Sequence, residues 1–175
     1  MNAFLDALQA QGPADDCGGK MALYAWLIGS WEIDTVETAP DGDVRRRIGE
    51  WHFGWALEGR AIQDVWIVPK RGARHAADAV ADAAYYGTTL RVYDPRIDAW
   101  HIRWTDPVAQ AYLSQIGRKE GDAIVQEGKD ALGKSRRWSF TEIAPDSFLW
   151  RGEVSEDGGT TWFTHMEFRA RRTAG

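Results

Sequence analysis

The chain has 175 residues, of which 44% are hydrophobic and 10 are tryptophans, and its formal net charge is −5. This length fits one domain with a sizeable core, and so many indoles either fill that core or line a pocket. The acidic balance excludes nucleic acid as a partner, because phosphate binding needs a basic face. Cys17 is the only cysteine, which excludes an internal disulfide and a CxxC metal site.

The N-terminus and the longest apolar run bear on location. The first ten residues carry Asp6 inside their only apolar patch and have no basic stretch, so we expect no secretory signal. The run from Met21 to Gly29 is too short to cross a bilayer. A lone cysteine is typical of a reducing compartment. We therefore expect a cytoplasmic protein without a membrane partner.

The first 30 residues favour one or two short helices. An apolar side over residues 4–8 indicates a first helix, which Gly12-Pro13 ends, and a second begins near Lys20. Helical spacing stops at Leu27. From Trp31 onward, apolar and polar residues alternate with the period of a strand.

Short extended segments separated by turn residues make up the rest of the chain. The predicted strands are 31–39, 44–56, 61–68, 86–93, 100–104, 109–117, 123–128, 136–143, 148–154 and 161–171. Short turns join consecutive strands, and no crossover helix follows Tyr85. We predict an all-β fold: an antiparallel up-and-down β-barrel of about 8–10 strands with one or two short N-terminal helices. Residues 1–19 would be a helical extension and residues 20–172 the barrel domain.

Residues 70–84 interrupt this pattern. The segment is rich in alanine, carries charges of both signs, and has Val80 as its one large aliphatic side chain. It holds no firm anchor to a core, and long connections in compact domains are either functional or disordered. A lid and a disordered insertion remain alternatives.

The junction between the second helix and the first strand reads Gly29-Ser30-Trp31. Gly29 lets the backbone turn, and Trp31 is large enough to close one end of a barrel. This placement resembles the Gly-x-Trp motif of the calycin superfamily, the lipocalins and fatty-acid-binding proteins. Residues 51–60, 90–104 and 157–162 extend the resemblance, which covers about residues 20–172 and includes bacterial single-domain calycin-like proteins of unassigned function.

The resemblance implies structural roles and a type of function. Gly29 and Trp31 would be structural, and an arginine of the closing strand, Arg169 or Arg171, would pack against Trp31. Calycin barrels enclose small ligands, and some act as enzymes. The chain departs from secreted lipocalins because it has no cysteine pair and we expect no signal peptide.

The hairpin 86–104 is the most informative segment for a site. If Tyr93 pairs with Trp100, one face carries more aromatic residues and should point inward, which would bury Arg91. A buried guanidinium needs either a protein carboxylate or an anionic ligand. An internal pair or a register slip that turns Arg91 outward is the alternative. The candidate ligand-binding residues are Thr89, Arg91, Tyr93, Trp100 and Trp104.

The last hairpin, 148–171, poses the same question of which face points inward. Its charged residues alternate with apolar ones, and a solvated charged face is the ordinary explanation. Turned inward, His165 and Glu167 would form a general base with an orienting carboxylate, and Tyr93 is a third acid–base candidate.

Metal and cofactor motifs are absent from the sequence. The four histidines show no HxH or HExxH spacing, and we find no GxSxG, P-loop or dinucleotide motif. We therefore expect no metal and no cofactor. Haem bound through His165 is the one alternative.

Three hypotheses follow. The first is a barrel that binds a small amphipathic anion. The second is an enzyme on the same barrel, a cyclase, isomerase or hydrolase of a small metabolite, and the third is a packed homodimeric barrel without a ligand. Fold cannot decide between them.

Overall fold

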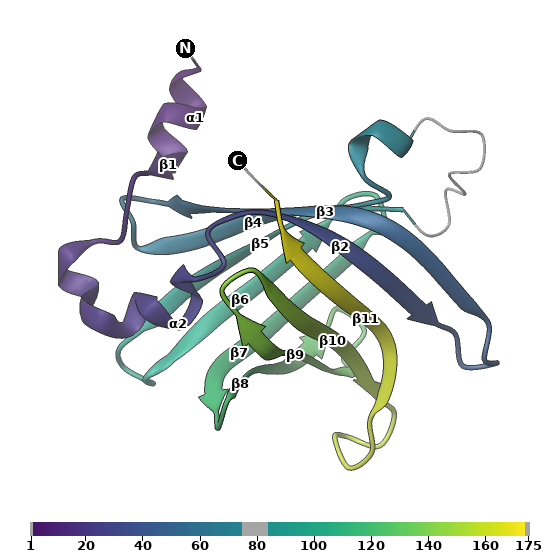
Figure 1. The fold of residues 1–175 in the computed structure, drawn as a ribbon. Coiled ribbons are helices and arrows are strands. Elements are labelled where there is room, and N and C mark those ends of the chain that lie inside the picture. The colour runs from purple at the N-terminus through teal and green to yellow at the C-terminus, as the bar shows by residue number, and fades with distance from the viewer. Residues whose placement is uncertain (1, 75–83, 174–175) are drawn as a thin grey trace.

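The computed structural model describes residues 2–74 and 84–173, which form a closed antiparallel barrel of ten strands (Figure 1). The strands are β2 (Gly29–Thr38), β3 (Val44–Ala56), β4 (Ala61–Val68), β5 (Tyr85–Asp94), β6 (Ala99–Asp106), β7 (Ala111–Glu120), β8 (Ala123–Asp130), β9 (Ser135–Ala144), β10 (Ser147–Ser155) and β11 (Phe163–Arg172). Each strand pairs with the next, and β11 pairs with β2 to close the barrel. The predicted all-β, up-and-down barrel is confirmed.

The helical segments are short. They are α1 (Ala3–Leu8), the 3₁₀ helices η1 (Asp15–Met21) and η2 (Arg71–Ala73), and α2 (Ala22–Ala25). The segment η1–α2 lies across one end of the barrel, which we call the capped end (Figure 1). The β6–β7, β8–β9 and β10–β11 turns lie at the opposite end, which we call the far end. No helix among the described residues is long and apolar enough to cross a membrane.

Several contacts tie the N-terminal segment to the barrel. The two-residue strand β1 (Gln9–Ala10) pairs with the end of β3, and the Arg60 guanidinium bonds the Asp16 carboxylate at 2.8 Å. The boundary expected at residue 19 therefore falls inside η1. Most of the expected lid, residues 75–83, lies outside the described residues.

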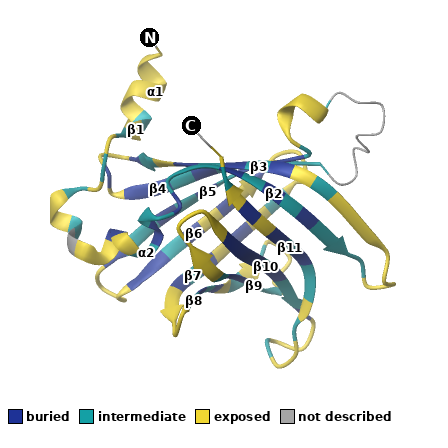
Figure 2. Ribbon diagram, viewed as in Figure 1, coloured by how far each residue is buried: buried dark blue, intermediate teal, exposed yellow. Residues whose placement is uncertain are grey.

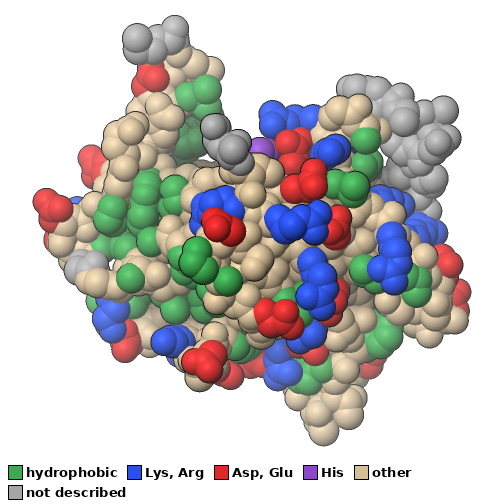
Figure 3. All heavy atoms as spheres, viewed as in Figure 1, with side chains coloured by type: hydrophobic (Ala, Val, Ile, Leu, Met, Phe, Trp, Pro, Cys, Tyr) green, Lys and Arg blue, Asp and Glu red, His purple; other side chains and the backbone are tan. Residues whose placement is uncertain are grey.

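Inward-pointing and outward-pointing side chains alternate along each strand, and the inward-pointing ones form the core. Figure 2 shows buried and more exposed residues taking turns along the barrel strands, as the period of two requires. Seven tryptophans are buried, together with Phe140 and Phe168. On the outer face of β2, β3 and β11, Lys and Arg side chains lie beside Asp and Glu (Figure 3), for example Arg171 and Asp34 at 2.7 Å.

The helix-to-strand junction at Gly29-Ser30-Trp31 has the expected packing of an arginine against Trp31, but the arginine is Arg172. The Trp31 indole donates to Leu27 O at 2.7 Å and is buried. Arg172 covers its ring with 4.1 Å between Cζ and the centroid. Gly29 has φ +122°, and a Cβ there would lie 2.9 Å from Arg172 Nη1, so the position favours glycine.

The expected arginines, Arg169 and Arg171, were the wrong choice. Residues 166, 168 and 170 of β11 are buried, so Arg172 continues the inward face. Residues 169 and 171 point outward: Arg169 faces Glu142, and Arg171 pairs with Asp34.

Candidate functional site

The predicted binding residues all face the barrel interior, but they occupy three levels of it. Tyr93 and Trp100 line a cavity at the capped end, and Trp104 lines another at the far end. Thr89 and Arg91 are fully buried between the two. The inward face of this hairpin was therefore predicted correctly, whereas the five residues do not form one site. Their role in binding stays a prediction.

The middle level is organised by an internal ion pair. Arg91 Nη1 donates to Asp64 Oδ2, and both side chains are completely buried. Asp64 Oδ1 also accepts from the Thr89 backbone N–H at 3.1 Å. Burial raises the pKa of Asp64, and this effect outweighs the attraction of Arg91, which acts in the opposite direction. The sequence allowed either a protein carboxylate or an anionic ligand as the acceptor for a buried Arg91. In the structure the acceptor is the carboxylate of Asp64.

Other polar side chains surround this pair. Gln126 Nε2 donates to the Tyr24 hydroxyl at 2.9 Å, and Gln115 Nε2 donates to Gln126 O at 2.9 Å. Burial raises the pKa of Tyr24 to about 12, so its hydroxyl stays neutral. The Arg91 guanidinium lies over the Tyr24 ring, with 5.6 Å between Cζ and the centroid. These contacts fill the middle of the barrel.

Four indoles form a layer across the barrel, between the middle level and the far end. The rings belong to Trp66, Trp104, Trp138 and Trp150, which we call the indole layer. Each indole contacts the next around the circle, with centroid distances of 4.7, 5.9, 5.3 and 5.7 Å in that order. Within the described structure, the buried Nε1 atoms of Trp66 and Trp150 have no hydrogen-bond partner.

The far-end cavity lies against the indole layer and has a volume of about 280 Å³. Its other walls include Tyr85, Met166 and Leu113, and its polar groups include His165, Arg136 and Asp130. Arg136 and Asp130 form an ion pair at 2.8 Å. The arrangement is a concave, aromatic site with a few polar groups, which is typical of small-molecule sites.

His165 enters this cavity because of a β-bulge. Gly152 pairs with Met166 and Glu153 with Thr164, so His165 is an extra residue on β11. His165 and Met166 consequently both line the cavity. Burial, reinforced by the positive charge of Arg136, lowers the pKa of His165 to about 4. Within the described residues, this neutral imidazole makes no hydrogen bond or ion pair.

The three acid–base candidates do not come together. Glu167 accepts from Arg151 Nε at 2.9 Å on the outer face, while His165 lies in the far-end cavity. Tyr93 lies at the capped end, where its hydroxyl donates to Asp98 at 2.6 Å. The alternative in which His165 and Glu167 both turn inward as a dyad does not occur in the structure, because the bulge places the two side chains on different faces.

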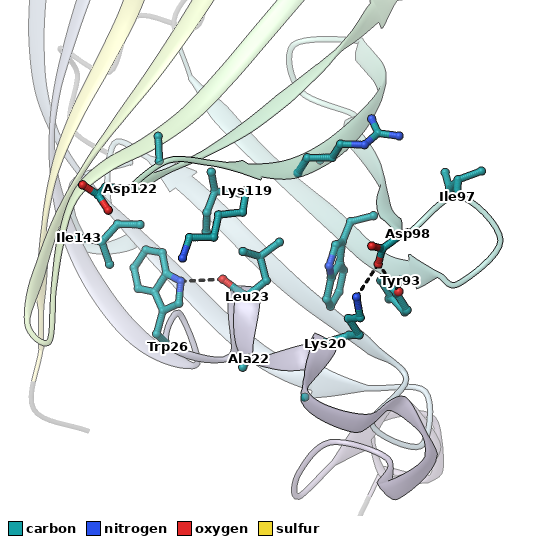
Figure 4. A pocket seen from close by; sticks show the side chains of 16 residues that line it. Lys20, Ala22, Leu23, Trp26, Tyr93, Ile97, Asp98, Lys119, Asp122 and Ile143 are labelled. Carbon is teal, nitrogen blue, oxygen red and sulfur yellow. Dashed lines mark hydrogen bonds and ion pairs between the residues drawn. The ribbon is translucent and has the colours of Figure 1, made fainter.

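A larger cavity, of about 930 Å³, lies at the capped end (Figure 4). One wall is the η1–α2 segment, and the other comes from the β5–β6 turn and the β7–β8 hairpin. The two cavities share no lining residue.

Sequence reasoning missed several residues of the interior. Asp64 stands between Ile62 and Trp66 at inward positions of β4, so strand alternation could have shown that Asp64 points inward, but not that Arg91 is its partner. The indole layer could not be found in this way, because its members come from four strands. In the described parts of the chain, no three His, Cys, Asp or Glu side chains gather as a metal site.

Comparisons with known proteins agree with the fold. No family model matches the sequence, and no curated protein matches it. Rv2717c from M. tuberculosis is similar in structure, with 16% identity, coverage of 89% of this chain and 98% of that chain, and a TM-score of 0.56. The S-type phycobiliprotein lyase CPES from Guillardia theta has 10% identity, coverage of 88% and 92%, and a TM-score of 0.58. Both share the ten-stranded barrel fold.

Proposed function

We propose that the protein binds a small, planar, acidic aromatic ligand in the far-end cavity. The observation that carries this proposal is the indole layer, whose four contacting rings offer an apolar surface at the base of a cavity of about 280 Å³. Aromatic rings pack favourably against such surfaces in offset or edge-on arrangements. A ligand of this size would be held mainly by ring contacts.

The polar groups of the cavity support an acidic ligand. His165 is neutral and has an unused hydrogen-bonding capacity among the described residues, so it can address one polar atom of the ligand. Arg136 is positively charged and lies close enough to His165 to add to the lowering of its pKa, of which burial is the larger cause. A carboxylate, sulfonate or phenolate is therefore favoured there over an ammonium group.

The location differs from the one expected at Arg91. The indole layer separates the far-end cavity from the middle level, where Arg91 is fully buried and already bonds Asp64 through Nη1. The ligand would thus meet Trp104 but not Arg91, Thr89, Tyr93 or Trp100.

Two matched alanines test the proposal. Ala111 is the first residue of β7 and lines the far-end cavity, and Ala123 is the first residue of β8 and lines the capped-end cavity. Both are half-buried. Binding of 8-anilinonaphthalene-1-sulfonate should be weakened roughly tenfold or more by Ala111→Phe and little changed by Ala123→Phe. The neutral N-phenyl-1-naphthylamine should bind more weakly than the sulfonate.

The opposite pattern would contradict the proposal. If Ala111→Phe leaves sulfonate binding intact, or if only Ala123→Phe weakens it, the far-end cavity is not the site. Circular dichroism and urea melts of both variants would show whether either substitution has disturbed the barrel.

Haem bound through His165, the alternative cofactor, does not fit this cavity. The His165 imidazole is neutral and has no partner among the described residues, but the cavity volume of about 280 Å³ is smaller than a porphyrin and the indole layer closes its base. Titration with hemin should therefore give no Soret band that depends on His165. A Soret band that His165→Ala abolishes would contradict this conclusion.

A further inference from the structure

The capped-end cavity has an elongated apolar floor. Its apolar side chains are Leu23, Trp26, Ile97, Trp100, Ile124 and Ile143. They extend from the β5–β6 turn to the end of β9, and Figure 4 shows Ile97 and Ile143 at opposite sides of the view. Ile97 and Ile143 are exposed to 43% and 37%. Leu23 and Trp26 are half-buried, and Trp100 and Ile124 form the buried base, so the strip is open to solvent mainly at its two ends.

The wall formed by η1 and α2 is firmly attached to the barrel. Met21, Tyr24 and Leu27 are buried in the core, and the Trp26 indole donates to Leu23 O at 2.8 Å. At the other side of the cavity, Lys20 Nζ lies 2.6 Å from Asp98 Oδ1. The floor and its walls therefore exist as a groove before any ligand arrives.

Some charged side chains around the groove have a partner, and others have no ion-pair partner among the described residues. Asp98 is engaged by Lys20 and by the Tyr93 hydroxyl (Figure 4). Among the described residues, Arg118 and Lys119 have no ion-pair partner, and the only other carboxylate that lines the groove is that of Asp122. Figure 4 shows the Lys119 side chain reaching from β7 toward Trp26 and Leu23. A cation thus lies at the edge of an apolar strip.

We propose that this groove is a second ligand site, which binds an amphipathic anion with a flexible apolar chain. The chain lies along Leu23, Trp26 and Ile143, and the acidic head lies at Lys119. A flexible chain fits because the strip is long and open at its two ends, whereas the far-end cavity is short and ends at the indole layer. The two sites share no residue, so either proposal can fail without the other.

Three ligands with ten-carbon chains test the assignment. Decanoate, whose tenth carbon is the carboxyl carbon, decanol and decyltrimethylammonium have tails of similar length and differ in the charge of the head. Isothermal titration calorimetry should give the order decanoate, decanol, decyltrimethylammonium from tightest to weakest. The indole N–H resonance of Trp26, assigned from its loss in Trp26→Phe, should shift when decanoate binds.

Matched charge reversals locate the head. Lys119→Glu should weaken decanoate roughly tenfold or more and strengthen decyltrimethylammonium, because the sign of the nearest charge is inverted. Lys129→Glu makes the same change of net charge at an exposed lysine near the end of β8, and it should leave both affinities within about twofold. Both lysines are exposed, so neither substitution threatens the fold.

The alanine variants locate the tail. Ala123→Phe should weaken decanoate, and Ala111→Phe should not. Equal affinities for the three heads, equal effects of Lys119→Glu and Lys129→Glu, a loss confined to Ala111→Phe, or no binding of decanoate would each overturn the proposal.

Discussion

The Arg172 guanidinium packs against the face of the Trp31 indole. The two Nη atoms of Arg172 also donate to Ile28 O at 2.8 Å and to Trp26 O at 2.7 Å. One side chain at the end of β11 thereby fixes the start of β2 and the end of the cap. Because β11 and β2 are the strands that close the barrel, this contact joins the closure to the helical cap.

Replacement of Arg172 should therefore destabilise the fold. Arg172→Leu keeps an apolar stem but loses the charged hydrogen bonds and the ring contact, and we expect a loss of about 2 kcal/mol in the free energy of unfolding. Arg169→Leu is the matched control on the same strand, since Arg169 points outward, and it should cost less than about 0.5 kcal/mol. Urea melts measure both. Equal losses for the two variants would contradict the role assigned to Arg172.

Trp31 should be the more sensitive partner. Its side chain is 1% exposed, and Trp31→Ala should cost about 3–5 kcal/mol, as the deletion of a buried large aromatic side chain does. A loss below about 1 kcal/mol in urea melts would mean that the indole does not close this end of the barrel.

Most of this architecture can be predicted from the sequence, because strands and turns are encoded by patterns over a few neighbouring residues. Turn residues and period-two alternation locate the strands, and alternation on β5 and β6 orients Arg91 and Trp104 inward. The same rule applied to Met166, Phe168 and Ala170 would have pointed to Arg172 in place of Arg169.

The candidate sites depend on relations that alternation does not contain. Asp64 meets Arg91 only through the β4–β5 register, which pairs Asp64 with Thr89 across a connection of many residues. His165 enters the far-end cavity through a bulge that breaks the alternation. The height of each inward residue along the barrel also follows from strand stagger, and this is why Tyr93 and Trp104 belong to different cavities.

Removal of the Arg91 charge should weaken the fold rather than the binding of anions alone. Arg91→Met leaves the Asp64 carboxylate buried without its partner, which should cost about 3–5 kcal/mol. The double variant Arg91→Met with Asp64→Leu removes both charges and should recover much of this loss. If the double variant is as unstable as the sum of the single variants, the ion pair does not govern the stability of this level.

The Arg91→Met variant should also respond to pH in a defined direction. Burial already raises the pKa of Asp64, and removal of Arg91 takes away the attraction that opposes this rise. The carboxyl group then folds more easily in its protonated form. The stability deficit of Arg91→Met relative to the native protein should consequently shrink as pH falls and grow as pH rises, which urea melts across acidic pH would show.

His165 gives the opposite dependence. Its pKa is lowered to about 4 in the folded protein, so below pH 6.5 the unfolded chain takes up a proton that the folded chain does not. The contribution of His165 to the free energy of unfolding is therefore fully present above pH 6.5. It falls by about 2–3 kcal/mol as the pH approaches 4. His165→Gln removes the titration and keeps a polar side chain in the cavity. Relative to the native protein, this variant should gain stability between pH 6.5 and pH 4, as measured by urea melts at several pH values. A constant difference between the two proteins across this range would show that His165 is not held neutral in the far-end cavity.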